Sequence, residues 1–312
     1  MESLQSIKSR IKGVKNINQI TKAMELVAAT KMRRSQAIAL ASRPYAFAAL
    51  ELLGNLARLE PELTGLSPVL APRTVKKEAY VLVTSDKGLA GSFNGAVIRA
   101  FEKYVRAQGV NLKSAAAVFI AVGKKAAQYL ERRVSNLPHR FIRVGDYTTV
   151  AEIRPIAEAL FAGYLAGDWD KVTVFSMHFR SALNQEVVQR ELLPISFAGL
   201  LKTAEEIVPE KGRFATERAG GNGAAATLEY LIEPSAREIV DKLAGHLLLM
   251  EIYHLVLEAN ASEHAARRMA MKNASDNAEE LAHGLTLAYN KSRQAAITKE
   301  ILEITAGAES LK

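Results

Sequence analysis

The sequence contains no cysteine and no apolar run long enough to cross a bilayer. Without cysteine there is no disulfide, no thiolate metal site and no thiol switch. The best apolar stretch, Leu247–Leu257, is interrupted by Glu251 and His254, whereas a membrane-spanning helix needs roughly 20 consecutive apolar residues. The chain enters a helical pattern at Leu4 without a signal peptide or a presequence. We therefore expect a protein that is made and used in a cytoplasm, or one that has already been processed.

The common motifs of catalysis and ligand binding are also missing. The six histidines form no H-E-x-x-H zinc motif, and there is no G-x-x-x-x-G-K-[S/T] phosphate loop. The loop at residues 84–95 follows a predicted strand, but its glycines are spaced G-x-x-G-x-x-x-G rather than G-x-G-x-x-G. This spacing favours a structural turn over a nucleotide site. We predict no catalytic residue, no cofactor and no metal, and a nucleotide-dependent enzyme is the weaker alternative.

The net charge of +8 is concentrated near the N-terminus. Residues 1–43 hold nine lysines and arginines against two glutamates, whereas residues 235–312 hold nine basic and eleven acidic residues. A basic helix face is often only a solvated surface, but it also suits an acidic protein partner or nucleic acid. A basic coiled-coil protein that binds nucleic acid through residues 8–34 therefore remains an alternative function.

Both ends of the chain have the periodicity of long helices. The N-terminal apolar stripe contains a three-residue slip and consists of Leu4, Ile7, Ile11, Val14, Ile17, Ile20, Met24 and Val27. The C-terminal heptad seam consists of Met271, Ala274, Ala278, Leu281, Leu285, Ala288, Ser292, Ala295, Lys299 and Leu302. A capping box of Ser235 and Glu238 marks a helix start. We predict a helix over residues 235–305 packed antiparallel against a helix over residues 4–54.

The middle of the chain alternates between strand and helix patterns. Strands are predicted at 79–84, 115–122, 140–144 and 171–179, with an edge strand at 185–195, and helices at 93–108, 124–132 and 149–165. This order predicts a parallel sheet covered on both faces. The fold class is therefore α/β with long helices: an antiparallel coiled coil of the N- and C-terminal helices plus a Rossmann-like α/β middle domain.

The same patterns predict where the parts of the chain begin and end. The predicted parts are an N-terminal coiled-coil helix at 1–58, a linker at 59–76, the α/β domain at 77–200, a mobile insertion and return strand at 201–232, and a C-terminal coiled-coil helix at 233–312.

Four segments of the chain closely resemble the gamma subunit of F-type ATP synthase. They are ITKAMELVAATKMRRSQ (20–36), TSDKGLAGSFN (84–94), ASEHAAR (261–267) and AYNKSRQAAITKEI (288–301). The resemblance implies a central stalk, with the terminal helices inside the alpha/beta hexamer and the middle domain beside the membrane ring of c subunits. Such a chain is a non-catalytic rotor shaft that transmits torque from the ion-driven c-ring to the catalytic sites of the hexamer.

The resemblance also implies contact residues and partners. By position, Met24, Lys31 and Arg34 correspond to the segment that faces acidic loops of the beta subunits. The residues that correspond to contacts with the catch loops of the hexamer are Arg267, Arg293, Gln294, Thr298 and Glu300. The implied partners are the alpha and beta subunits, the epsilon subunit and the c-ring of Fo, without nucleic acid. Membrane association is then peripheral, through the complex only, at the cytoplasmic face of the bacterial inner membrane.

Overall fold

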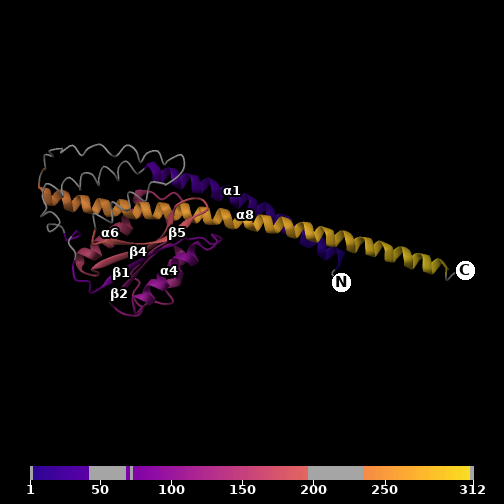
Figure 1. The fold of residues 1–312 in the computed structure, drawn as a ribbon, viewed down its shortest axis with the longest axis horizontal. Coiled ribbons are helices and arrows are strands. Elements are labelled where there is room, and N and C mark those ends of the chain that lie inside the picture. The colour runs from indigo at the N-terminus through magenta and orange to yellow at the C-terminus, as the bar shows by residue number, and fades with distance from the viewer. Residues whose placement is uncertain (1–2, 42–67, 71–72, 196–232, 234, 310–312) are drawn as a thin grey trace. The chain divides into compact units, whose positions relative to one another are not determined.

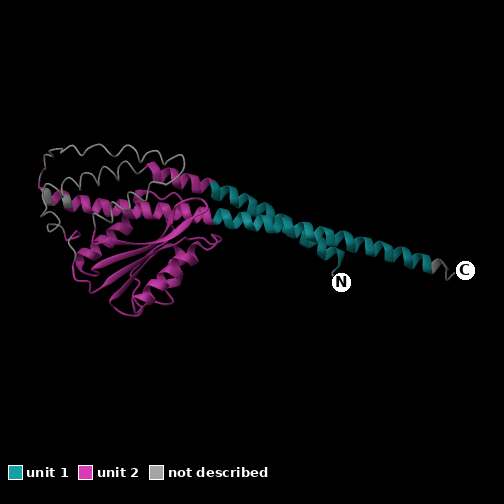
Figure 2. Ribbon diagram, viewed as in Figure 1, with its two compact units in different colours: residues 1–29, 267–312 teal, residues 30–266 magenta. Residues whose placement is uncertain are grey.

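The computed structural model describes residues 3–41, 68–70, 73–195, 233 and 235–309. The chain divides into two compact units, one of residues 1–29 with 267–312 and one of residues 30–266 (Figure 2). We call them unit 1 and unit 2. The helices α1 (Leu4–Ala41) and α8 (Ala236–Glu309) contribute to both (Figure 1).

Unit 1 is an antiparallel pair of helices. The Asn18 Nδ2 of α1 donates a hydrogen bond to the Ser275 carbonyl oxygen of α8 at 3.1 Å, and the Ser275 hydroxyl donates to Asn18 Oδ1 at 3.3 Å. Further along α1, Glu25 Oε1 lies 3.9 Å from Arg268 Nε. Residue numbers rise along α1 while they fall along α8, so the helices run antiparallel, as predicted.

The line of contact on α1 differs from the predicted stripe. Among its buried and partly buried positions, those that form a continuous line are Ile7, Ile11, Val14, Asn18, Thr21, Glu25 and Ala28, with Met24 partly buried beside them. This is an unbroken alternation of four- and three-residue steps, so the predicted three-residue slip after Val14 is wrong. Ile17, Ile20 and Val27, which the prediction placed in the seam, are 55–59% exposed.

The predicted seam on α8 is also partly wrong. The buried and partly buried positions that form the observed line are Met271, Ser275, Ala278, Ala282, Leu285 and Tyr289. Leu281 is 50% exposed, and Ala288, Ala295, Lys299 and Leu302 are exposed. The physical reason is that a heptad seam can be built from small and polar residues when their hydrogen bonds are satisfied within the pair, as those of Asn18 and Ser275 are.

Unit 2 contains a five-stranded sheet in the order β3-β2-β1-β4-β5. The strands are β1 (Glu78–Val83), β2 (Ala117–Val122), β3 (His139–Phe141), β4 (Lys171–Phe179) and β5 (Gln185–Leu193). The first four are mutually parallel, as predicted, and the edge strand β5 is antiparallel to β4. The helices between them are α4 (Phe93–Ala107), α5 (Lys124–Leu130) and α6 (Val150–Ala166).

Helices cover both faces of the sheet, as predicted. Phe175 of β4 packs against Phe101 of α4, with ring centroids 5.4 Å apart. The next residue, Ser176, points to the opposite face, where its hydroxyl lies 3.5 Å from the Leu255 carbonyl oxygen of α8. His178, two residues further on the same face, lies 2.7 Å from Glu258 of α8, and both side chains are buried. The sheet thus holds α8 through the polar contacts of Ser176 and His178, and residues of β4 and α8 also share one apolar core.

Several predicted features lie outside the described residues. They are the continuation of the first helix over 42–54, most of the linker at 59–76, and the insertion at 201–232. The predicted capping bond is present at the start of α8, where the Glu238 amide donates to the Ser235 hydroxyl at 3.3 Å. Among the described helices, none combines the length and apolar composition of a membrane-crossing segment.

Candidate functional site

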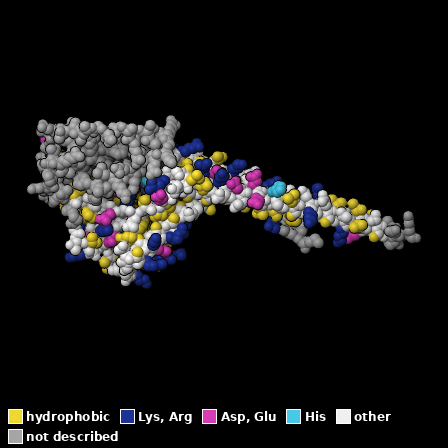
Figure 3. All heavy atoms as spheres, in the orientation of Figure 1, with side chains coloured by type: hydrophobic (Ala, Val, Ile, Leu, Met, Phe, Trp, Pro, Cys, Tyr) yellow, Lys and Arg dark blue, Asp and Glu magenta, His cyan; other side chains and the backbone are white. Residues whose placement is uncertain are grey.

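The apolar stripe displaced from the seam lies on one flank of α1 in unit 1. Ile17, Ile20 and Val27 are exposed, and Met24, which belongs to the same three- and four-residue spacing, is partly buried. Lys22 is exposed on the same stretch of helix. Hydrophobic side chains and Lys or Arg side chains are interspersed on the surface of this helix pair (Figure 3). Such a surface suits a partner that offers apolar and acidic side chains together.

The two cations predicted beside Met24 belong to unit 2, and both contact the loop between β3 and α6. The Lys31 ammonium donates a hydrogen bond to Asp146 Oδ2. The Arg34 guanidinium lies over the ring of Tyr147, 4.3 Å from its centroid, in the geometry of a cation–π contact. Their charges therefore already have contacts within the chain.

The predicted contact residues on α8 have contrasting surroundings. Arg267 is buried, with 9% of its surface exposed, whereas Arg293, Gln294, Thr298 and Glu300 are all exposed. The structure thus leaves the last four available to a partner and encloses the first.

The exposed four lie on a part of α8 that α1 does not accompany. The register fixed by the Asn18–Ser275 contact places Leu4, the first residue of α1, level with Tyr289. Beyond that level the exposed large apolar side chains are Ile297, Ile301, Leu302 and Ile304, with exposed fractions of 48–65%. We call residues 290–309 the tip of α8. About half of each side chain remains to be buried, so enclosing them in a partner would contribute on the order of 1–2 kcal/mol per side chain.

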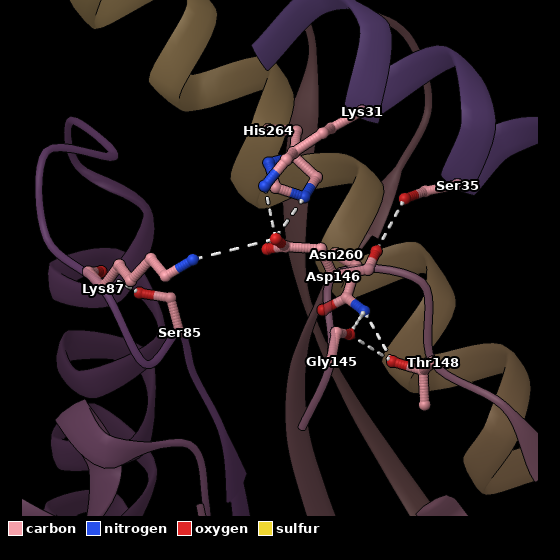
Figure 4. Close-up of polar contacts among 9 residues, drawn as sticks. All are labelled: Lys31, Ser35, Ser85, Lys87, Gly145, Asp146, Thr148, Asn260 and His264. Atoms are coloured by element: carbon pink, nitrogen blue, oxygen red, sulfur yellow. Dashed lines mark hydrogen bonds and ion pairs between the residues drawn. The ribbon is translucent and has the colours of Figure 1, made fainter. Parts of the chain in front are cut away.

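Asp146 stands at the centre of a polar cluster in unit 2 (Figure 4). Besides Lys31, its carboxylate faces Lys87 Nζ at 3.8 Å and His264 Nε2 at 3.6 Å. Its backbone carbonyl accepts a hydrogen bond from the Ser35 hydroxyl at 3.3 Å. We call Lys31, Ser35, Lys87, Asp146, Asn260 and His264 the Asp146 cluster.

The loop that carries Asp146 is held on its other side by Asn260 of α8. The Asn260 Nδ2 donates to the Gly145 carbonyl oxygen at 3.1 Å and to the Thr148 hydroxyl at 2.8 Å. The Thr148 hydroxyl in turn donates to the Gly145 carbonyl oxygen at 2.8 Å. Both the side chain and the backbone of this loop are therefore fixed.

The surroundings of Asp146 lower its pKa. Burial by itself raises the pKa of the carboxyl, but the hydrogen bond from Lys31 and the charges of Lys31, Lys87 and His264 outweigh that effect. The net result is a pKa below the ordinary value for aspartate. The carboxylate thus stays ionised in the folded chain throughout the physiological pH range.

The loop after β1 is held by hydrogen bonds within itself. The Ser85 amide donates to Asn94 Oδ1 at 2.9 Å, and the Ser85 hydroxyl donates to the Lys87 carbonyl oxygen at 2.6 Å. These bonds occupy the amide and the hydroxyl of Ser85. Within the described ranges, no group of three or more histidine, aspartate or glutamate side chains is arranged to hold a metal ion.

The sequence interpretation missed the Asp146 cluster. Its members are far apart in the chain: Lys31 and Asp146 are separated by 115 positions, and so are Gly145 and Asn260. One local signal was available, because Thr149 and Glu152 form a capping box that starts α6 directly after the loop. That pattern fixes where the loop ends, but not what it contacts.

Comparisons with known proteins give a consistent result. The ATP synthase family profile matches residues 3–311. The ATP synthase gamma chain of Herpetosiphon aurantiacus is 38% identical over 100% of this chain and 99% of its own length. The ATP synthase gamma chain of a Cyanothece species is 40% identical over the full length of both chains.

Solved structures support the same fold. A chain of the central stalk and c-ring structure of the Tetrahymena thermophila mitochondrial ATP synthase matches with a TM-score of 0.60 and 24% identity, covering 82% of this chain and 99% of that one. A chain of the Euglena gracilis mitochondrial ATP synthase matches with a TM-score of 0.61 and 18% identity, covering 99% of this chain and 94% of that one. On the full-length matches to curated relatives and the family profile, the chain belongs to the ATP synthase gamma chain family.

Proposed function

We propose that this protein is the central rotor shaft of F1Fo ATP synthase, transmitting torque from the ion-driven c-ring to the catalytic sites of the alpha/beta hexamer. The observation that carries the proposal is the tip of α8, a single helix with exposed apolar side chains from Ile297 to Ile304, in a chain of the gamma family. A lone apolar helix of this kind needs a surrounding partner. ATP synthesis takes place on other subunits of the complex, and this chain is a non-catalytic subunit.

Rotation would be coupled to catalysis through unequal flanks of the helix pair. One flank of α1 carries Ile17, Ile20, Met24 and Val27, and the seam beside it contains the polar residues Asn18, Thr21 and Glu25. As the shaft turns, each catalytic subunit would meet a different flank. A ligand or partner shifts a conformational equilibrium only by contacting its states differently, and an asymmetric shaft supplies that difference to each catalytic site in turn.

The proposed contact residues fall into two groups. Met24 on the exposed flank would meet acidic loops of the beta subunits, together with Lys31 and Arg34, which reach them while contacting Asp146 and Tyr147. At the tip, Arg293, Gln294, Thr298 and Glu300 would contact the catch loops of the hexamer. Arg267 is buried, so we propose that its contact involves only the edge of its side chain.

The remaining proposals concern the other partners and the location. We place the α/β domain, residues 77–200, beside the c-ring and the epsilon subunit, with the insertion at 201–232 between that domain and the C-terminal helix of 233–312. The other two parts of the proposed domain division are the N-terminal helix at 1–58 and the linker at 59–76. The protein would be held peripherally, by the complex alone, at the cytoplasmic face of a bacterial inner membrane. The comparisons lend no support to the nucleic-acid alternative.

The proposal is tested by assembly and by hydrogen exchange at the tip. We expect the chain to copurify with alpha, beta and epsilon subunits, and the amides of residues 290–309 to exchange at least tenfold more slowly in the complex than in the free chain. The exposed turn around Leu183, outside the proposed hexamer contact, serves as the internal control. Equal exchange of the tip in both states, or binding of free DNA that weakens steeply with salt in place of assembly, would reject the rotor role.

A further inference from the structure

The Asp146 cluster joins four separate parts of unit 2 through one carboxylate (Figure 4). Lys31 and Ser35 come from α1, Lys87 from the loop after β1, and His264 from α8, while Asp146 itself lies in the loop between β3 and α6. Lys31 and His264 lie close to the ends of unit 2 on their helices, since that unit spans residues 30–266. The cluster therefore includes residues near the point on each long helix where the chain passes between unit 2 and unit 1.

Three side chains on consecutive turns of α1 contact the same two residues. Lys31 and Ser35 hydrogen-bond to the side chain and backbone of Asp146, and Arg34 stacks on Tyr147. By contrast, α8 is held by the apolar core, in which Leu248, Leu255 and Leu257 are at most 1% exposed. Among the described residues of α1, only the partly buried Ile38 and Ala39 pack against that core. The polar contacts of Lys31, Arg34 and Ser35 with one loop therefore have a larger share in holding α1 than polar contacts have in holding α8.

Removing the Asp146 carboxylate would replace attraction by repulsion among the basic side chains of the cluster. Asp146 is the acid that Lys31, Lys87 and His264 share, and each of them approaches it to within hydrogen-bond or ion-pair distance. Lys31 and Asp146 keep only 27% and 28% of their side-chain surfaces exposed, so water screens the pair incompletely. Without the carboxylate, two ammonium groups and an imidazole would face one another around an uncharged group.

We propose that Asp146 is a positioning residue that locks α1 to the α/β domain and holds Lys31, with Arg34 beside it, in a fixed direction. The lock makes the helix and the domain move as one body at the point where torque would pass between them. The mechanical consequence rests on the proposed rotor function, whereas the locking itself does not.

The variants Asp146→Asn and Asp146→Glu test the lock in the assembled complex. We expect Asp146→Asn to speed amide exchange in residues 30–41 at least threefold, and to reduce ATP-driven ion pumping in vesicles more than ATP hydrolysis. Asp146→Glu retains the charge and should recover most of the protection. The matched control is Glu131→Gln, which removes a carboxylate from an ion pair with Arg140 whose side chains are 43% and 53% exposed. That control should change neither measurement.

A covalent substitute keeps the proposal testable if Asp146→Asn assembles poorly. The chain has no cysteine, so Lys31→Cys with Asp146→Cys introduces a unique pair. Joining them with a short bis-methanethiosulfonate linker should restore both exchange protection and pumping. Unchanged exchange in Asp146→Asn, or no gain from the linker, would overturn the lock. Altered exchange with pumping and hydrolysis unaffected would retain the lock and refute its role in rotation.

Discussion

The strength of an ion pair in this protein depends on the water that remains around it. Lys299 and Glu303 form a pair one helical turn apart on α8, but their side chains are 79% and 67% exposed. Such a pair contributes a few tenths of a kcal/mol at most. Lys31 and Asp146 have the same chemistry with less than a third of either side chain exposed and with further hydrogen bonds to the loop. Only the second pair is placed to fix the backbone around it.

The pH dependence of stability reports on Asp146 directly. Its pKa is lowered in the folded chain, so its stabilising contribution is complete above the ordinary aspartate pKa of about 3.9 and is lost as pH falls below that value. We expect Asp146→Asn to lower the free energy of unfolding by about 1 kcal/mol at pH 7. Urea titrations of both chains should show this difference unchanged down to about pH 5 and shrinking below about pH 4.

The Glu131→Gln chain again provides the comparison, because its exposed pair should give a difference near zero at every pH. A gap between wild type and Asp146→Asn that stays constant down to pH 2.5 would contradict an ionised Asp146 as its origin.

The Asp146 cluster also marks the limit of sequence-based prediction for the site. Met24, Arg293 and Thr298 were selected by resemblance of local segments, and their positions on long helices follow from periodicity alone. Asp146 and His264 become neighbours only after the sheet and both helices are assembled. Their pairing depends on contacts between elements, which local patterns do not encode.

At the scale of elements, the strands were predictable because buried strands of a parallel sheet are nearly continuous apolar runs. The predicted strand 171–179 and the observed β4 (Lys171–Phe179) agree at both ends. The third strand is shorter than predicted, since β3 covers only His139–Phe141 at the sheet edge. At the edge, β3 pairs with β2 alone, so fewer hydrogen bonds and side-chain contacts stabilise its ends. The antiparallel orientation of β5 relative to β4 could not be predicted from the residues of β5 alone.

The seam of the helix pair was harder to predict, because hydrophobicity pointed to the wrong flank. Ile17 and Ile20 are more apolar than Asn18 and Thr21, yet the structure exposes the two isoleucines, buries Thr21 and partly buries Asn18. Asn18 can occupy the seam because Ser275 satisfies its amide. The isoleucines are then available to another chain, so the error itself carries functional information.

A glycine in α6 provides a test at this scale. A methyl group added at Gly163 would lie 2.1 Å from Cζ2 of Trp169, whose indole is buried and donates to the Leu160 carbonyl oxygen at 3.1 Å. Overpacking of this kind typically costs about 1–3 kcal/mol. We expect Gly163→Ala to lower the free energy of unfolding by that amount and to shift Trp169 fluorescence. Ala162→Ser, on the exposed side of the same helix, should leave the fluorescence unchanged and cost no more than about 0.5 kcal/mol. Because Gly→Ala by itself favours a helix by about 1 kcal/mol, a Gly163→Ala chain that is as stable as wild type or more stable would show that the Trp169 contact relaxes.

At the scale of the whole molecule, the gamma family role requires that one chain bind its partners differently at each angle of rotation. Uniform affinity around the helix pair would stabilise the complex without favouring any angle. The exposed flank of α1 and the tip of α8 differ in how far their apolar side chains extend around the helix. The tip's apolar side chains between Ile297 and Ile304 span roughly 160° of the helix circumference, about twice the arc of the flank from Ile17 to Val27. The wider arc suits a contact that is kept through more of each revolution. The flank of α1 covers the narrower arc, which suits a contact that is made and broken as the shaft turns.

Met24 tests that one-sided contact. Met24→Lys would add a cation to a flank that we propose meets acidic beta-subunit loops, and a charged contact there is worth about 1–3 kcal/mol. Because the contact forms only in some rotational states, it should trap those states and raise the barrier to leaving them. We expect weakened coupling in reconstituted vesicles, with hydrolysis largely kept and ion-driven synthesis impaired more strongly. Gln19→Lys is the matched control, because Gln19 is exposed and lies about 140° around the helix from Met24, away from the flank. Equal losses of both activities, no loss, or the same loss in the control would remove Met24 from the torque-bearing surface.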